Sequence, residues 1–199
     1  KDAEDESSKR LGWVTSASDS QHLIQSILAL RADFADKGVD RFVLCGMGGS
    51  SLAPEVITST AGVALVVLDS TDPSQVQDAL NGAISRTAII VSSKSGSTVE
   101  TDSQKRIFEK AFNDAGIDKS ERIVIVTDPG SPMEAAAKAD GYRIFNADAT
   151  VGGRYSALTA FGLVPSGLAG ADIQALLDDA NSVSELLSSD SQDNPALVL

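Results

Sequence analysis

Two turns rich in glycine and hydroxyl side chains are the parts of this chain whose residues could bind a phosphate group. One spans residues 92–101, SSKSGSTVET, between the apolar run 88–91 and a helical pattern. The other spans residues 46–51, GMGGSS, and follows the apolar run 42–45. A strand that opens into such residues at the start of a helix directs backbone N–H groups and hydroxyls at one spot. The two turns together therefore predict an anion-binding site.

Five short apolar runs alternate with helical patterns along the chain, which is typical of βα units with a mostly parallel sheet. We expect strands at 41–45, 64–68, 87–91, 122–127 and 143–145. Helices are expected at 20–36, 52–60, 73–81, 98–115, 132–139, 157–164 and 171–188. The near-continuous apolar character of the runs favours strands covered on both faces. The pattern predicts an α/β fold, a three-layer αβα sandwich around a five-stranded sheet.

The order of these elements also predicts where a ligand would bind. In open parallel sheets, ligands bind outside the carboxyl ends of the strands, where the strand order reverses. Both phosphate-type turns follow carboxyl ends of strands, and we expect the loops 69–72 and 127–131 at the same edge. The binding site should therefore lie along that edge.

Composition narrows the classes of partner. The formal charge of -12 disfavours nucleic acid and anionic membrane surfaces as main partners. No apolar run approaches the roughly 18 to 20 residues that a membrane-spanning helix needs. The single cysteine, Cys45, ends an apolar strand, which favours a buried thiol over a nucleophile. We expect a reducing, cytoplasmic setting.

Three motifs of this chain occur in the order seen in a known enzyme family. They are GMGGS at 46–50, SKSGSTVET at 93–101 and VGGRYS at 151–156. With this set the chain resembles the glucose-6-phosphate isomerase family, and in particular its first sugar isomerase (SIS) domain. The small-residue forms of the motifs are similar to those in the isomerase part of fused transaldolase/glucose-6-phosphate isomerase proteins. The resemblance covers about residues 38 to 199.

The resemblance implies a reaction and a set of site residues. The family interconverts glucose 6-phosphate and fructose 6-phosphate through an enediolate, without metal or organic cofactor. The motifs imply that Arg154 stabilises the enediolate, and a guanidinium suits this because it stays charged and presents several donors. The implied substrate- and phosphate-binding residues are Gly49, Ser50, Ser93, Lys94, Ser95, Gly96, Thr98 and Gly153. For Lys94 we expect the backbone N–H to matter more than the side chain.

After these motifs, the chain departs from the family pattern. The resemblance implies a glutamate base, a histidine for ring opening and a lysine from later sequence, with the histidine supplied by the partner subunit of a homodimer. His22, the only histidine, lies near the start of the first predicted helix, where a surface or capping role is expected. We therefore expect a piece of a longer protein that binds sugar phosphate weakly and isomerises it negligibly.

The expected organisation has three parts. Residues 1–37 form an N-terminal extension and first helix, and residues 38–168 form the SIS sugar-phosphate-binding domain. Residues 169–199 form a helix and a truncated connection toward a missing C-terminal SIS domain.

Three other interpretations stay open. The 92–101 turn could be a simple helix N-cap, with Thr98 and Thr101 satisfying the first-turn donors. A non-catalytic SIS module that senses sugar phosphates would use the same turn but would not need Arg154 after the glycines. A dinucleotide-binding domain would use the Gly46 turn and Asp69, but a serine, Ser51, stands where the third glycine of its fingerprint belongs.

Overall fold

The computed structural model of the chain describes residues 2–198 and contains one five-stranded sheet. The strands are β1 (Arg41–Gly46), β2 (Val66–Leu68), β3 (Thr87–Ser92), β4 (Ile123–Thr127) and β5 (Arg143–Asn146). They lie in the order β2-β1-β3-β4-β5, and every neighbouring pair is parallel. The predicted α/β architecture with five parallel strands is confirmed, and each predicted strand ends within two residues of the observed one.

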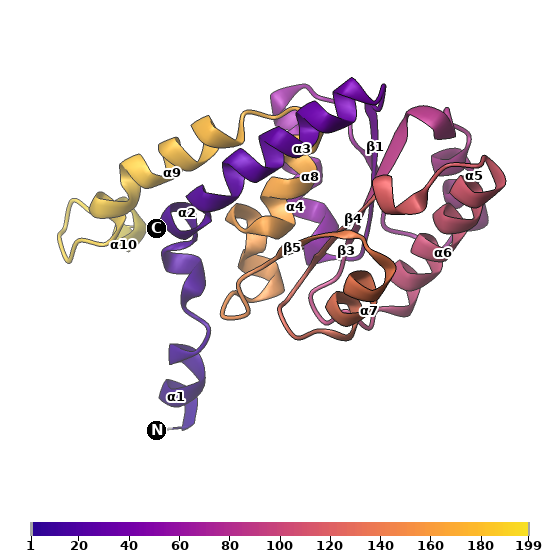
Figure 1. The fold of residues 1–199 in the computed structure, drawn as a ribbon. Coiled ribbons are helices and arrows are strands. Elements are labelled where there is room, and N and C mark those ends of the chain that lie inside the picture. The colour runs from indigo at the N-terminus through magenta and orange to yellow at the C-terminus, as the bar shows by residue number, and fades with distance from the viewer. Residues whose placement is uncertain (1, 199) are drawn as a thin grey trace.

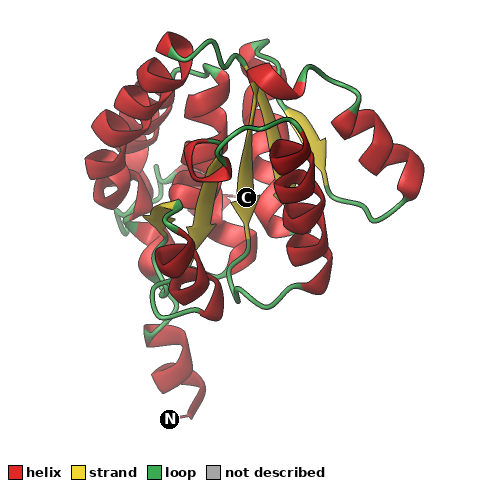
Figure 2. Ribbon diagram, turned by 45° about the vertical axis from the view of Figure 1, so that its right-hand side comes forward, coloured by secondary structure: helices red, strands yellow, loops and turns green. Residues whose placement is uncertain are grey.

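Helices cover both faces of this sheet (Figure 1, Figure 2). The long helices are α3 (Ile24–Asp36), α4 (Gly49–Ala61), α5 (Pro73–Leu80), α6 (Val99–Asp114), α7 (Pro132–Asp140), α8 (Ala160–Ala169) and α9 (Ile173–Leu187). Shorter helical pieces are α1 (Asp2–Ser8), η1 (Gly12–Val14), α2 (Ser16–Asp19), η2 (Ser20–Leu23), η3 (Ile84–Arg86), η4 (Lys119–Glu121), η5 (Gly153–Leu158) and α10 (Pro195–Val198). None of the described helices is long and apolar enough to cross a membrane.

Two separate cores hold the three layers together. Side chains alternate along β1, so that Phe42 and Leu44 pack into one core and Val43 and Cys45 into the other. The first core receives side chains of α3, α8 and α9, and the second receives those of α5, α6 and α7. Helix α4 packs against α8 on the side of the first core. The central strands β1, β3 and β4 are therefore buried on both faces, which is why their sequences are almost wholly apolar.

The segments that flank residues 38–168 share the first core. Ile27 and Phe34 of α3 are buried in the same cluster as Leu163 of α8 and Leu177 of α9. The helices before and after the predicted binding domain thus help to form its interior, whereas α1 lies apart from the sheet (Figure 1).

Two predicted helices differ from the observed ones in ways that affect the site. The helix expected at 157–164 begins at Ala160, because residues 153–158 form the 3-10 turn η5 and the Thr159 hydroxyl accepts a hydrogen bond from the Phe161 N–H group. It runs through Pro165 to Ala169, five residues beyond the expected end at residue 164. Helix α4 begins at Gly49, three residues earlier than expected at Leu52, because Gly48 has a φ of 58° and turns the chain sharply after β1.

Candidate sugar-phosphate site

The candidate site lies where the strand order reverses. The chain leaves β1 for β2 on one side and then crosses to β3 on the other, so the loops after β1 and β3 diverge. Gly46 and Ser92, the last residues of these two strands, are paired in register. Between the loops lies a cleft of about 480 Å³, lined by Met47, Gly49, Ser50, Ser92, Ser93, Lys94, Ser95, Thr98, Asp128 and Gly153. The two phosphate-type turns thus meet at the carboxyl edge of the sheet.

Two helices present uncapped N-termini at this cleft. Helices α4 to α7 each follow a strand, and the N-termini of α5 and α7 are capped by the side chains of Asp72 and Ser131. Neither Gly48 before α4 nor Thr98 before α6 supplies a side-chain cap. In α4 the Ser50 and Ser51 N–H groups already donate to the Met47 and Gly48 carbonyl oxygens. Without side-chain caps, the positive dipole ends of both helices remain available to an anion.

The Thr98 hydroxyl takes part in the loop and does not cap the helix. Its Oγ1 lies 3.1 Å from Ser93 Oγ, and Thr101 Oγ1 is buried without a hydrogen-bond partner in the described part of the chain. The interpretation of this turn as an N-cap satisfied by Thr98 and Thr101 was therefore wrong.

Internal hydrogen bonds fix the shape of the 93–98 loop. The Gly96 N–H group donates to Ser93 Oγ over 3.2 Å, and the Ser97 N–H group donates to Ser95 Oγ over 3.3 Å. The Thr127 hydroxyl donates to the Ser93 carbonyl oxygen and contacts the Ser131 hydroxyl. The loop is thus anchored to the end of β4, and its serine side chains are held at the cleft.

Gly96 lies behind the wall of the cleft, next to α7. It does not line the cleft, and its N–H group already donates to Ser93. A Cβ atom at this position would come within 2.9 Å of the Met133 Cβ atom, so the loop packs tightly against α7 here.

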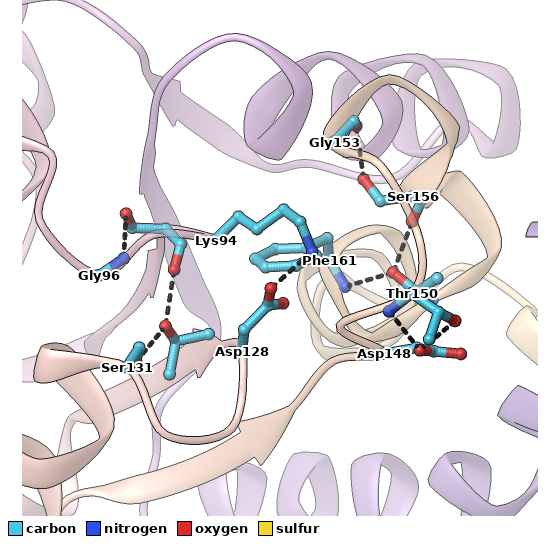
Figure 3. Close-up of polar contacts among 12 residues, drawn as sticks. Lys94, Gly96, Asp128, Ser131, Asp148, Thr150, Gly153, Ser156 and Phe161 are labelled. Atoms are coloured by element: carbon cyan, nitrogen blue, oxygen red, sulfur yellow. Dashed lines mark hydrogen bonds and ion pairs between the residues drawn. The ribbon is translucent and has the colours of Figure 1, made fainter. Parts of the chain in front are cut away.

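Lys94 extends its side chain across the cleft. Its Nζ atom lies 2.5 Å from Asp128 Oδ2, and the two side chains are 27% and 16% exposed (Figure 3). Asp128 is the first residue after β4, the strand beside β3. The positive charge of Lys94 is therefore balanced within the site by a carboxylate.

A close backbone contact joins the first and third motifs. A Cβ atom on Gly49 would lie 2.5 Å from the Gly153 carbonyl oxygen, so only glycine allows this approach. The same carbonyl accepts a hydrogen bond from the Ser156 hydroxyl over 2.8 Å (Figure 3). The VGGRYS turn is thereby held against the N-terminus of α4.

Arg154 lies beside the cleft and does not line it. It borders an adjoining, mostly apolar cavity of about 630 Å³, and Gly49 and Gly153 line both spaces. Its guanidinium is exposed and has no ion pair or hydrogen bond to the described residues. The next residue, Tyr155, stacks on Trp13 with ring centroids 5.5 Å apart. Thus seven of the nine predicted site residues line one cleft, and Gly96 and Arg154 lie next to it.

The other singled-out residues lie elsewhere. Cys45 is fully buried in β1, and burial raises the pKa of its thiol to about 12, as expected for an inert thiol. His22 is exposed, and its Nδ1 atom lies 2.6 Å from the Asp19 carbonyl oxygen. It is not among the residues that line the cleft.

Three lining residues were not in the predicted set, namely Met47, Ser92 and Asp128. Met47 lies within the first motif and Ser92 directly precedes the second, so both could have been included from their positions alone. Asp128 belongs to a loop that was expected at this edge, but only the adjacency of β3 and β4 brings it to the phosphate-type turn.

Comparisons with known proteins agree with this geometry. A model of the phosphoglucose isomerase family matches residues 19–199. A probable glucose-6-phosphate isomerase of Haloarcula marismortui is 37% identical over 158 residues, which are 77% of this chain and 36% of that relative. The crystal structure of a hypothetical protein from Thermus thermophilus superimposes with a TM-score of 0.86 at 33% identity, over 95% of this chain and 46% of that one.

A more distant structure supports the fold alone. Tagatose-6-phosphate ketose/aldose isomerase of Escherichia coli gives a TM-score of 0.56 at 14% identity, over 93% of this chain and 52% of that one.

The chain spans about half the length, or less, of each of these three proteins. The match to the family model begins at residue 19 and so includes α3, which lies before the first of the three motifs. With its motifs gathered at one cleft and a family match over nearly its whole length, the chain belongs to the phosphoglucose isomerase family.

Proposed function

We propose that this chain forms the sugar-phosphate-binding part of an aldose–ketose isomerase that interconverts glucose 6-phosphate and fructose 6-phosphate in the cytoplasm. The observation that carries the proposal is the cleft at which the uncapped N-termini of α4 and α6 meet the hydroxyls of the 93–98 loop. A phosphate dianion accepts hydrogen bonds and donates none, so this cleft, with its donors and positive dipole ends, suits it.

The phosphate lies against the 93–98 loop in this proposal. The hydroxyls of Ser93, Ser95 and Thr98 donate to it, and Ser50 at the start of α4 donates from the opposite wall. Gly49 and Gly153 carry no side chains, which leaves room for the sugar between the two walls. Residues 38–168 form the binding domain, with 1–37 and 169–199 as flanking parts.

Arg154 stabilises the enediolate in this proposal. Arg154 follows Gly153 at the border of the cleft, and its guanidinium has no competing carboxylate among the described residues. A fixed positive charge aimed at a developing oxyanion lowers the barrier without proton exchange.

The proton transfer between the two carbon atoms requires a base as well. Among the described residues that line the cleft, the only carboxylate is that of Asp128, which is ion-paired with Lys94. We therefore expect the purified 199-residue chain to bind sugar phosphate and to turn it over negligibly. The glutamate base, a histidine and a lysine come from the rest of a longer protein with a second SIS domain, which acts as a homodimer.

The test is a calorimetric titration of the chain with fructose 6-phosphate, with NAD as the comparator. The double variant Ser95→Ala/Thr98→Ala removes two donors of the loop. Ser103→Ala is the matched control, because its exposed hydroxyl lies on α6 and donates to the Val99 carbonyl oxygen. A coupled assay for glucose 6-phosphate on the same samples measures turnover.

We expect saturable binding of fructose 6-phosphate that Ser103→Ala retains and the double variant loses by about tenfold or more. Binding of NAD without fructose 6-phosphate would instead favour a dinucleotide domain. Binding that the double variant leaves unchanged would refute the placement of the phosphate, and ready turnover by the chain would refute the need for a base from outside it.

A further inference from the structure

Asp128 places a carboxylate in a cleft that suits an anion, and this needs a physical reason. Its Oδ2 atom is paired with Lys94 Nζ at 2.5 Å. Its Oδ1 atom is buried and accepts no hydrogen bond from the described residues. Burying a carboxylate oxygen without a hydrogen-bond donor costs free energy. A bound ligand that supplies the donor would remove this cost.

The chemistry of the carboxylate limits what that donor can be. Asp128 accepts hydrogen bonds and repels negative charge, so it opposes a bare phosphate ion. Lys94 neutralises this repulsion without supplying a donor to Oδ1. A sugar hydroxyl can donate to Oδ1, and a hexose phosphate carries several hydroxyls on the sugar that bears its phosphate ester.

We propose that Asp128 is a specificity-determining residue that accepts a hydrogen bond from a ligand hydroxyl and so selects polyhydroxylated phosphate esters over inorganic phosphate. The inference rests on the proposed function, since it takes the phosphate to lie at the 93–98 loop. The loop and the helix N-termini hold the phosphate of any ligand. Asp128, paired with Lys94, accepts a hydrogen bond from the sugar that is attached to this phosphate.

The geometry explains why Lys94 and Asp128 come from different strands. Lys94 follows β3 and Asp128 follows β4, and Figure 3 shows the lysine side chain extending from its loop to the carboxylate. The ion pair holds the carboxylate in one position, and the Ser131 and Thr127 hydroxyls fix the base of the Asp128 loop. A positioned acceptor discriminates between ligands better than a mobile one.

The experiment compares two ligands on the 199-residue chain at fixed ionic strength. Calorimetry measures the Kd of fructose 6-phosphate and that of inorganic phosphate for the unchanged chain, for Asp128→Asn and for Asp128→Ala. Asparagine keeps the size but loses the charge, and alanine removes the acceptor. Asp114→Asn is the matched control, because Asp114 forms an exposed pair with Lys110 at the far end of α6, 2.7 Å apart.

We expect both Asp128 variants to bind fructose 6-phosphate about tenfold more weakly, because a charge-assisted hydrogen bond is lost. Inorganic phosphate should bind them equally well or about threefold more tightly, because a negative charge has been removed. The Kd of inorganic phosphate divided by that of fructose 6-phosphate therefore falls by about tenfold or more in the variants and stays unchanged in Asp114→Asn.

Two results would overturn the inference while the proposed function stands. One is an unchanged ratio in Asp128→Ala, and the other is an equal loss of affinity for both ligands, which would mean that Asp128 only shapes its loop. If the unchanged chain binds inorganic phosphate but not fructose 6-phosphate, the proposed function fails and the inference fails with it. Circular dichroism melts of all variants establish that each one is folded.

Discussion

Replacing Gly49 by alanine tests whether the contact between α4 and the VGGRYS turn holds the site together. A Cβ atom at Gly49 would lie 2.5 Å from the carbonyl oxygen of Gly153 and 2.9 Å from its carbonyl carbon. Ordinary contacts between such atoms are about 3.5 Å long, so the two backbones must separate by about 1 Å. That displacement would carry Arg154, the next residue, away from the cleft.

The other side of the same contact provides a matched control. A Cβ atom at Gly153 meets no heavy atom within 4 Å, and Gly153 does not have a positive φ. The same change from glycine to alanine at Gly153 should therefore be neutral or stabilise the chain by about 0.5 kcal/mol. Overpacking at Gly49 should cost about 2 kcal/mol, which lowers the Tm of a chain of this size by about 4–8 °C.

The assay pairs thermal melts with fructose 6-phosphate titrations of both variants. Gly49→Ala should melt at a lower temperature and bind the sugar phosphate about tenfold more weakly, because a shift of this size misaligns Ser50 and the facing turn. Gly153→Ala should match the unchanged chain in its melting temperature, which is the measurement it controls, because Gly153 itself lines the cleft. If Gly49→Ala behaves like Gly153→Ala, the close approach of the two backbones does not hold the site, and the reasoning is wrong.

Two further predictions concern the loop that carries Asp128. The Glu134 carboxylate accepts hydrogen bonds from the Lys138 ammonium, the Gly130 N–H group and the Asn146 amide, which lower its pKa from 4.5 to about 2. The ionised side chain therefore stabilises the fold fully above about pH 4.5, and this contribution is lost as the pH falls toward 2. Urea titrations should thus show the stability difference between the unchanged chain and Glu134→Gln at its largest near about pH 7 and smaller on acidification; a constant difference would contradict the assigned pKa. Ser131→Ala removes the cap that accepts from the Glu134 N–H group over 3.1 Å and should cost about 1 kcal/mol in urea unfolding. No loss in Ser131→Ala would mean that another group takes over the cap.

Much of the fold could be predicted from local patterns. Strands such as β3 and β4 are buried on both faces, so their composition marks them without knowledge of their neighbours. The helix starts at Pro73 and Pro132 were predicted correctly, because proline suits the first turn of a helix, and the structure adds that Asp72 and Ser131 cap these two helices. The start of α8 was misplaced, because Thr159 caps a helix that follows a 3-10 turn, and apolar periodicity does not distinguish the two.

Some residues of the candidate site could also be predicted from the sequence, and others could not. The two turns were identified because they place hydroxyls and backbone N–H groups together at helix starts, and the family resemblance implied which of their residues bind the substrate. Asp128 was not chosen, since its loop is separated from the 93–98 loop by a helix and a strand in sequence. The position of Arg154 outside the cleft was also unpredictable, because it follows from the packing of the η5 turn on α4.

Local sequence was sufficient to establish the βα alternation, the two phosphate-type turns and the third motif that marks the family, because these features depend on residues close together in the chain. Which loops share a cleft depends instead on the folded arrangement of the strands. The order β2-β1-β3-β4-β5 places the ends of β1, β3 and β4 side by side and so pairs Lys94 with Asp128, whereas the packing of η5 on α4 pairs Gly49 with Gly153. Those pairings arise from burial of both sheet faces and from strand order, which are properties of the whole fold.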